Sequence, residues 1–452
     1  MTKLNFLTIT LITFSVLFFI SHISQVKAQT STINVSTLTQ LQGAIANLVS
    51  NQTILIADGI YNLNSVLYLP QNISNIVIKG ASGNRDSAVI KGPGMNNSSV
   101  NFGFWLENID GITFQDLTIR DFYQHGIIAN GGVNKPVFRN LRIIDVGDQF
   151  IKNNPTLDQL NGVDDGVLEN SLFEYTSSAP DNYTNGLDIH RGDNWLVRNN
   201  TFKNFKSVGA LAGPAVLIWN GSKNTIVTGN TFINNQRDIS LGLDQNKALG
   251  STDHSGGIIA NNFIYKTSSV VPDVSIAVFD SPNTKVYYNS ILAGGYPNAI
   301  EYRFPRTTTV DIRNNLTDAG VTSRDGATAT MSNNITTASS ALFVNATAGD
   351  MHLVSTASVA IDKGVQVSVI NDFDNQSRPA GSAPDVGADE YGGTGAEILK
   401  GDLNNDRIVN SLDWSIMNNK WLTSDIGADL NADGIVNSLD FSIMNGNWLK
   451  SV

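Results

Sequence analysis

Two segments near the C-terminus repeat one spacing of oxygen-bearing residues. In residues 402–413, and again in residues 429–440, an acidic or amide side chain occupies positions 1, 3, 5, 9 and 12. A backbone carbonyl at position 7 completes the oxygen shell that a hard cation requires. The ligands expected are Asp402, Asn404, Asp406, Ile408, Asn410 and Asp413 in the first segment, and Asp429, Asn431, Asp433, Ile435, Asn437 and Asp440 in the second. The spacing predicts that each segment binds a hard cation.

Each of these cation-binding segments continues into residues with helical spacing, and we expect helices at 414–421 and 441–448. The pair resembles a type I dockerin, including the Asp at position 12 where ordinary EF-hand loops carry Glu. The resemblance implies two bound calcium ions and a cohesin-type partner on a scaffold or surface protein. Arg407 departs from the dockerin pattern, because the turn usually has glycine there.

A second set of side chains that could take part in catalysis or binding lies on short strands in the body of the chain. If strands aligned from Gly186, Ala215, Ser275 and Ala299 stack in register, their apolar residues face inward and the others face outward together. The strand at 149–153 fits this alignment less well. The candidates for catalysis are Lys152, His190, Arg191, Asp244, Asp280 and Arg303. The candidates for sugar binding are Asp188, Trp219, Asn220, Phe279, Glu301 and Arg324, since aromatic rings beside polar groups are typical of ligand sites.

These candidates favour β-elimination on an acidic sugar polymer. Elimination needs a positive charge to neutralise the uronate carboxylate, and a base to take the proton beside it. Arg303 or Arg191 would supply the charge, and His190 or Lys152 would be the base. Arg303 is open to a second interpretation, as the partner of Glu301 in a surface ion pair.

Hydrolysis of a glycosidic bond is the third hypothesis for the same face. A glycosidase needs two carboxyl groups roughly 5–9.5 Å apart. Asp188 and Glu301 lie four repeats apart and would be on the order of 19 Å from each other. Asp244 and Asp280, one repeat apart, are the pair that remains.

The elements that position these residues recur along the chain. Short Asn-centred phrases followed by apolar residues, such as Asn199-Asn200-Thr201-Phe202 and Asn261-Asn262-Phe263, return every roughly 20 to 30 residues between 53 and 344. Asn tolerates the left-handed backbone of a sharp corner, and its amide can bond the same corner in the next repeat. The period and the short strands predict a β-solenoid, with a capping helix in residues 37–50 behind Thr37.

The body, residues 30–391, resembles right-handed parallel β-helix proteins, a class that includes polysaccharide lyases and pectin-acting enzymes. The resemblance rests on residues 54–61 at one end and on 372–379 and 384–391 at the other. Residues 185–192 are loosely similar to a strand of alginate and chondroitin lyases of this type, but the full Lys/Arg pattern of those enzymes is missing. We therefore expect an all-β parallel β-helix followed by a small α-helical dockerin.

The N-terminus and the composition indicate export. Residues 1–28 have the basic start, apolar run and small-residue cleavage site of a signal peptide. Residues 392–399 form the expected linker, and residues 400–452 the dockerin-like domain. The chain has no cysteine, and its net charge of −11 argues against nucleic acid as a partner. No membrane span is expected once the signal is cleaved.

The sequence thus predicts a secreted polysaccharide-degrading enzyme, preferably a lyase acting on a uronate-containing polymer. The alternative of another class is a non-catalytic, carbohydrate-binding or adhesive β-helix. The polymer, its linkage, the cohesin-like partner, the oligomeric state and a further calcium ion in the β-helix all stay open.

Overall fold

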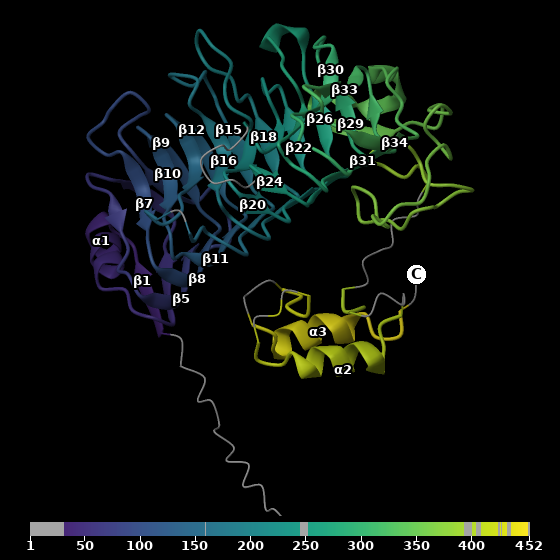
Figure 1. Cartoon of the computed structure of the whole chain (residues 1–452). Coiled ribbons are helices and arrows are strands. Elements are labelled where there is room, and N and C mark those ends of the chain that lie inside the picture. The colour runs from purple at the N-terminus through teal and green to yellow at the C-terminus, as the bar shows by residue number, and fades with distance from the viewer. Residues whose placement is uncertain are drawn as a thin grey trace, which may run out of the picture.

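The computed structural model describes residues 31–158, 160–244, 252–392, 400–403, 408–423, 425, 427–431 and 435–450. The predicted signal peptide and most of the predicted linker lie outside these residues. Strands stack from the N-terminal α1 toward the C-terminal coils, as Figure 1 shows from purple to green. The fold is the predicted parallel β-helix, in which each coil between the two terminal ones contributes one strand to each of three long sheets.

All three sheets are parallel. The first sheet has the order β1 (Ser31–Val35), β2 (Gln52–Ile56), β5 (Ile73–Gly80), β8 (Ile109–Gln115), β11 (Asn134–Arg139), β14 (Val167–Glu169), β17 (Leu196–Arg198), β21 (Ile226–Thr228), β25 (Ile258–Ala260), β28 (Lys285–Tyr287), β31 (Val310–Arg313) and β34 (Ala329–Ser332). The second sheet has the order β3 (Gly59–Asn62), β6 (Ala88–Lys91), β9 (Thr118–Phe122), β12 (Arg142–Val146), β15 (Leu172–Glu174), β18 (Thr201–Lys203), β22 (Thr231–Ile233), β26 (Phe263–Tyr265), β29 (Ser290–Leu292) and β32 (Leu316–Thr317). The third sheet has the order β4 (Leu67–Tyr68), β7 (Phe102–Leu106), β10 (His125–Ala129), β13 (Gln149–Asn153), β16 (Asn185–His190), β19 (Val216–Trp219), β23 (Ile239–Leu241), β27 (Ile276–Phe279), β30 (Asn298–Arg303) and β33 (Gly320–Arg324).

The remaining elements are short. Two small sheets pair β20 (Ser222–Lys223) with β24 (His254–Ser255), and β35 (Phe343–Asn345) with β36 (Asp350–Leu353). The helices are α1 (Leu38–Ala46), α2 (Ser411–Asn419) and α3 (Ser438–Gly446), with 3-10 turns η1 (Ser268–Val270), η2 (Ser340–Leu342) and η3 (Ala346–Ala348). None of the described helices is long and apolar enough to cross a membrane.

The core consists of apolar side chains that stack from coil to coil. Phe173, Phe202 and Phe232 lie in register on neighbouring strands of the second sheet, and each successive pair of ring centroids is 5.0 Å apart. Each ring covers the next, so a single coil on its own would leave its ring exposed to solvent. This stacking explains how the fold holds together without disulfides.

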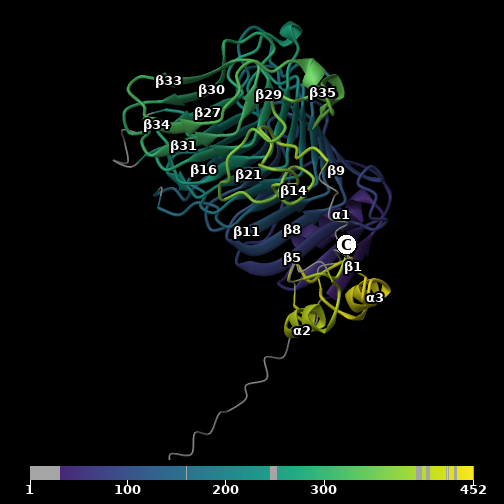
Figure 2. The ribbon, with the colours of Figure 1, turned by 90° about the vertical axis from the view of Figure 1, so that its right-hand side faces the viewer.

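The N-terminal end of the stack is covered by the predicted helix. The Thr37 side chain caps α1 by accepting a hydrogen bond from Gln40 N, and Leu41, Ala44 and Ile45 are its buried residues. In the view of Figure 2, α1 lies at the same end as β1. Strand β1 comes before α1 in the chain and pairs with β2, so the first coil begins earlier than the sequence suggested.

At the other end, residues 371–391 fold back onto the last coils. Phe373 stacks on Phe263 with ring centroids 3.8 Å apart, and Asn261 Nδ2 donates to Asn371 O over 2.8 Å. The Arg378 side chain is fully buried and donates to Glu390 over 2.8 Å. This segment closes the solenoid laterally and supplies polar groups to its corner.

The Asn phrases divide two roles between their two positions. The first residue turns the corner with a left-handed backbone, as in Asn199 (φ 56°). The second residue, buried in every coil except the last, forms a ladder in which each amide bonds the next coil. The ladder runs through Asn200, Asn230, Asn262, Asn289, Asn315 and Asn334, with amide N to amide O distances of 2.9–3.0 Å. The predicted inter-coil bonding is confirmed.

Replacing Asn230 with alanine should lower the free energy of unfolding by about 2–4 kcal/mol, because buried partners on two neighbouring coils lose their bonds. Asn230 bonds Asn200, Asn262 and the Val197 carbonyl and is fully buried. Denaturant titration followed by circular dichroism measures the change. Asn199→Gly is the control. Asn199 directly precedes the ladder residue Asn200 and turns the corner of the neighbouring coil, and its replacement should have little effect because glycine tolerates its φ of 56°. Equal stability of the Asn230 variant would contradict the ladder's role.

Candidate functional site

The outward side of the third sheet gathers several of the predicted candidates. Lys152 on β13 pairs in register with Asp188 on β16, and His190 pairs with Trp219 on β19. Outward residues of three neighbouring strands therefore meet. On β13 the register differs by one residue from the expected alignment, because Lys152, and not Ile151, takes the place beside Asp188.

Lys152, Asp188, His190 and Trp219 form one group of contacting side chains, here called the Lys152 cluster. Asp188 lies at its centre and is 1% exposed. Its Oδ2 pairs with the Lys152 ammonium, and its Oδ1 accepts a 2.9 Å hydrogen bond from Trp219 Nε1. Burial opposes ionisation of Asp188, but the bonds and charges of His190 and Lys152 outweigh it and lower its pKa to about 2. Asp188 is therefore an anion at neutral pH that orients its neighbours.

His190 is the more accessible partner, with 16% of its side chain exposed against 6% for Lys152. Lys152 Nζ lies 2.7 Å from His190 Nε2, and Asn220 Nδ2 lies 3.4 Å from Nδ1. The rings of His190 and Trp219 have centroids 4.5 Å apart. A proton acceptor, a cation and an aromatic ring thus converge at one point of the sheet.

Tyr183 joins the Lys152 cluster, although it was not among the candidates predicted from the sequence. Its hydroxyl is 3.4 Å from Lys152 Nζ, and the ammonium is 5.6 Å from the ring centroid. The residue is 56% exposed and lies between β15 and β16, where its amide donates to Asp181 over 2.7 Å. This segment stands outside the repeating strands, so periodicity carries no signal for it.

Arg191 and Asn220 border the cluster at the corner that follows β16 and β19. Both have left-handed backbones, with φ of 55° and 59°. Arg191 Nε donates to Leu160 O over 3.3 Å, and Asn220 N donates to Asp253 Oδ1 over 2.8 Å. The two candidates therefore lie at one corner, next in sequence to His190 and Trp219.

The remaining sugar-binding candidates form a second cluster on β27, β30 and β33. Glu301 is 2% exposed and accepts bonds from Arg324 over 3.1 Å and from Asn298 over 2.7 Å. Arg303 pairs with Asp325 and lies 5.9 Å from the Phe279 ring centroid. Four strand steps separate β16 from β30, so this cluster is apart from the first.

The structure does not bring Asp244 and Asp280 together as an accessible carboxyl pair. Asp280 is fully buried, and Arg306 binds both of its oxygens, with Nε donating over 2.8 Å. The Asp253 amide donates to Asp280 over 3.0 Å. Asp244 is exposed and its amide donates to Asp253 over 3.0 Å. Asp280 is engaged in packing its corner, where its amide donates to Arg303 O over 3.1 Å.

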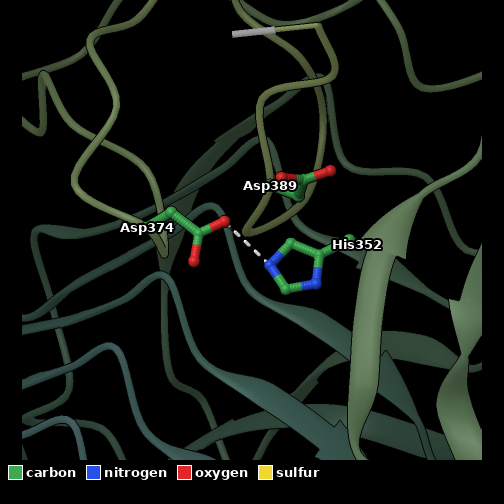
Figure 3. A group of neighbouring side chains, drawn as sticks. All are labelled: His352, Asp374 and Asp389. Carbon is green, nitrogen blue, oxygen red and sulfur yellow. Dashed lines mark hydrogen bonds and ion pairs between the residues drawn. The ribbon is translucent and has the colours of Figure 1, made fainter. Parts of the chain in front are cut away.

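Among the described residues, one group of His and Asp side chains lies close enough to surround an ion. It consists of His352, Asp374 and Asp389, whose candidate ligand atoms all lie within 4.8 Å of one another (Figure 3). His352 Nε2 is 2.8 Å from Asp374 Oδ2, and Nδ1 is 2.5 Å from Asp350 Oδ1. Calcium takes oxygen ligands, so the imidazole fits that ion poorly. The group is better described as an imidazolium between carboxylates.

This His352 group should make stability depend on pH. The Asp374 hydrogen bond, helped by Asp350, raises the pKa of His352 to about 9. A raised pKa in the folded state stabilises fully below the unfolded value of about 6.5, and the gain is lost as pH rises through 9. His352→Gln should therefore lower the melting temperature by a few degrees at pH 6, and by almost nothing at pH 10. A difference that stays constant with pH, in thermal melts of both proteins, would contradict this assignment.

A cavity of about 770 Å³ lies elsewhere, at the corner between the first and second sheets. Its lining includes Arg198, Thr228, Asn261 and residues 369–375. Residues of the Lys152 cluster do not line it. The cavity and the Lys152 cluster on the third sheet are therefore separate features.

In the C-terminal calcium segments, the described ligands surround the start of each helix. Asn410 and Asn437 cap α2 and α3, and Asp413 and Asp440 complete a capping box in each. The helices thus begin three residues earlier than predicted, since the caps lie directly before residues 411 and 438. Asn404, Asp406 and Asp433, like Arg407, fall outside the described residues.

The sequence profile of the dockerin type I domain matches residues 400–447. These residues form a type I dockerin domain. Domains of this family bind calcium, and a dockerin implies a cohesin partner. In the dockerin of this chain, Asp413 and Asp440 are fully buried, and their carboxylates accept bonds from Leu403 N and Asn431 N in the loops that precede the helices.

The two dockerin helices pack together and hold the loops that would bind calcium. Met417 of α2 and Met444 of α3 are buried in one small core with Val409 and Val436. Asp402, Ile408, Asp429 and Ile435 supply further oxygens of the type that calcium takes. The donor chemistry of the dockerin therefore fits calcium, with each loop tied to its helix through the residue at position 12.

Solved structures similar to this chain are β-helix proteins. The alginate lyase from Paenibacillus sp. str. FPU-7 is 15% identical, covering 68% of this chain and 95% of that chain with a TM-score of 0.42. Pectate lyase Pel9A is 18% identical, covering 77% and 90% with a TM-score of 0.45. PfbA, a surface adhesin of Streptococcus pneumoniae, is 12% identical, covering 66% and 86% with a TM-score of 0.35. These likenesses concern the fold. No curated protein matches the chain.

Proposed function

We propose that the chain is a secreted enzyme that cleaves a uronate-containing polysaccharide by β-elimination at the Lys152 cluster. The observation that carries the proposal is the convergence of Lys152, Asp188, His190 and Trp219 on the outward side of the third sheet. A buried ion pair costs desolvation and is weak support for stability, so its position under an accessible imidazole favours a chemical role.

The reaction assigns a distinct task to each group. The uronate carboxylate pairs with Lys152 and draws the ammonium away from His190 Nε2. In the uncharged form of the imidazole, which is the form that acts as the base, this nitrogen can then accept a proton. His190 takes the proton from the carbon beside the carboxylate, and the electron pair forms a carbon–carbon double bond as the bond to the neighbouring glycosidic oxygen breaks. The leaving oxygen receives a proton from the hydroxyl of Tyr183, 3.4 Å from Lys152 Nζ. Solvent returns the proton to Tyr183 and removes the one on His190.

Two further side chains bind the sugar. The Trp219 ring, fixed by its bond to Asp188, offers a face for stacking beside His190. Arg191, at the rim of the same corner, adds positive charge in a protein whose net charge is −11. Asp188 acts through the others, as a positioning residue.

Hydrolysis has less support than elimination. The carboxylate of Asp280 is bound by Arg306 and buried, and Asp188 is held as an anion by Lys152 and His190. A glycosidase needs an acid that can give up a proton and a second carboxylate close to it. Neither Asp280 nor Asp188 offers this arrangement.

The dockerin attaches this enzyme to a cohesin-bearing scaffold or cell surface. Such tethering keeps the enzyme near its polymer by raising the effective concentration. Export through the predicted signal peptide at 1–28 is part of this proposal. The adhesive alternative uses the same tether, and product analysis separates the two.

The test is incubation of the full chain, in calcium, with alginate, pectate, glycosaminoglycans and neutral glycans. Ultraviolet absorbance of unsaturated uronate and reducing ends are followed together. Lys152→Ala should remove both signals, whereas Lys91→Ala, an exposed lysine on the second sheet, should keep them. Reducing ends without absorbance would mean hydrolysis, and glycan binding without either signal would support the adhesive alternative.

Calcium removal should abolish docking. Chelation, or Asp413→Ala combined with Asp440→Ala, should eliminate binding to a panel of type I cohesins, because the buried position-12 carboxylates anchor both loops. Surface plasmon resonance measures the loss, and thermal melting of the β-helix serves as the control, which should be unchanged. Calcium-independent binding would contradict the proposed attachment.

A further inference from the structure

The third sheet carries aromatic side chains beyond the Lys152 cluster, toward its N-terminal edge. Tyr68 on β4 pairs in register with Trp105 on β7, Trp105 with Ile128 on β10, and Ile128 with Lys152 on β13. One outward row therefore runs from Tyr68 to Lys152 and on to Asp188. The first two residues of this row were not among the candidates predicted from the sequence.

The rings of this row form a connected surface. The Trp105 ring centroid is 6.0 Å from that of Tyr68 and 5.5 Å from that of Phe102. Phe102 stacks on His125 at 5.3 Å and 9°. Burial, together with the charge of Lys152, lowers the pKa of His125 to about 4, so this ring is uncharged at neutral pH. The surface is thus apolar, neutral and aromatic.

This aromatic row is not needed to fill the core. Leu67, Phe104 and Leu106 of the same strands already occupy the inward places and are buried. Tyr68, in contrast, is 58% exposed and Trp105 is partly exposed. Exposed aromatic groups of this kind mark binding surfaces more often than random surface positions.

Polar groups border the rings at the ends of the strands. Gln71 Nε2 donates to Glu107 over 2.8 Å, and Asn108 Nδ2 donates to Gln71 over 3.3 Å. Rings that can stack, with amides and a carboxylate beside them, suit a neutral or weakly charged sugar ring with its hydroxyl groups.

We infer that the row Tyr68–Trp105 is a distal subsite that stacks on glycosyl units of the same polymer chain that reaches the Lys152 cluster. The inference rests on the proposed function for the identity of the polymer. Trp105 is two strand steps from Lys152, about 10 Å, and Tyr68 is three steps away. The polymer lies along the solenoid axis, with one end toward β4, and internal bonds of long chains are the preferred points of cleavage.

The experiment compares long and short substrates, with binding and cleavage measured separately. Trp105→Ala and Tyr68→Ala should each raise the Kd for the polymer about tenfold by calorimetry, and raise KM with kcat nearly unchanged. Cleavage of trisaccharides should be unaffected. Trp105→Phe should restore most of the affinity, and Ile60→Ala, a 65% exposed apolar residue on the second sheet, is the matched control.

The outcomes separate this inference from the proposed function. Wild-type affinity in both alanine variants would overturn the subsite, whether or not the chain is a lyase. Polymer binding that drops in these variants, without any unsaturated product from wild type, would support the subsite and contradict the lyase. Failure of wild type to bind any of the acidic or neutral polymers would contradict both.

Discussion

Replacing His190 with alanine should reduce the rate of unsaturated product formation by about 10²- to 10⁴-fold, the usual contribution of a general base. His190 is the accessible acceptor beside the Lys152 ammonium, 2.7 Å away, and the Trp219 ring. Because binding depends on Trp219 and the basic groups, we expect kcat to fall much more than KM rises. Initial rates of absorbance increase, over a range of polymer concentrations, give both parameters.

Two further variants check that this loss reflects chemistry. His190→Gln, which keeps a polar side chain of similar length, should be as inactive as the alanine variant while melting like wild type. Asp188→Asn should lower kcat and also shift the pH profile, because it removes the anion that orients Lys152 and His190. If His190→Gln kept wild-type kcat, the base would have to be another group.

Replacing Asp238 with alanine should destabilise the β-helix by about 3–5 kcal/mol, because it leaves a buried ammonium without its counter-ion. Asp238 and Lys266 are both fully buried, with Oδ2 and Nζ 3.0 Å apart. Lys266 also donates to the carbonyls of Asp273 and Gln236, so it is held in place and cannot reach solvent easily. The midpoint of denaturant unfolding measures the loss.

The exposed pair Lys223–Asp193 is the matched control for that experiment. Its charged atoms are 3.6 Å apart and the lysine side chain is 57% exposed. Lys223→Ala should change stability by no more than about 1 kcal/mol, because solvent screens the pair. A similar small effect for Asp238→Ala would show that the buried pair does not anchor the coils.

The repeating parts of the fold were predictable because each coil has the same sequence pattern. The Asn phrases marked the corners, and the alternation placed Asp188, His190 and Trp219 on one side of the sheet. The dockerin helices were predicted too late by three residues, since Asn410 and Asn437 serve as helix caps as well as ligands of the loops.

What the sequence missed depends on contacts between coils and on segments outside the pattern. Alternation shows that Asp188 points outward, but its near-complete burial follows from Lys152, Trp219 and His190 closing over it. Tyr183 reaches the cluster from a segment without period. The partner of Asp280 is Arg306, which lies in a turn beyond β30 and carries no repeat signal.

The N-terminal aromatic row escaped prediction for a related reason. Strand β4 is only two residues long, and the early coils lack the Asn phrase that marks later corners. Without that marker, Tyr68 and Trp105 cannot be placed in register with Lys152 from the sequence alone. Inter-strand pairing, which the structure supplies, joins them into one surface.

Mass spectrometry of the products from a defined uronate oligosaccharide tests the central claim most directly. Elimination adds no water, so the masses of the two fragments should sum to that of the substrate, with one fragment carrying the new double bond. The account predicts this result for wild type and intact substrate for His190→Gln. Fragments whose summed mass exceeds the substrate by one water would contradict it, and would show that the Lys152 cluster is not the site of a lyase.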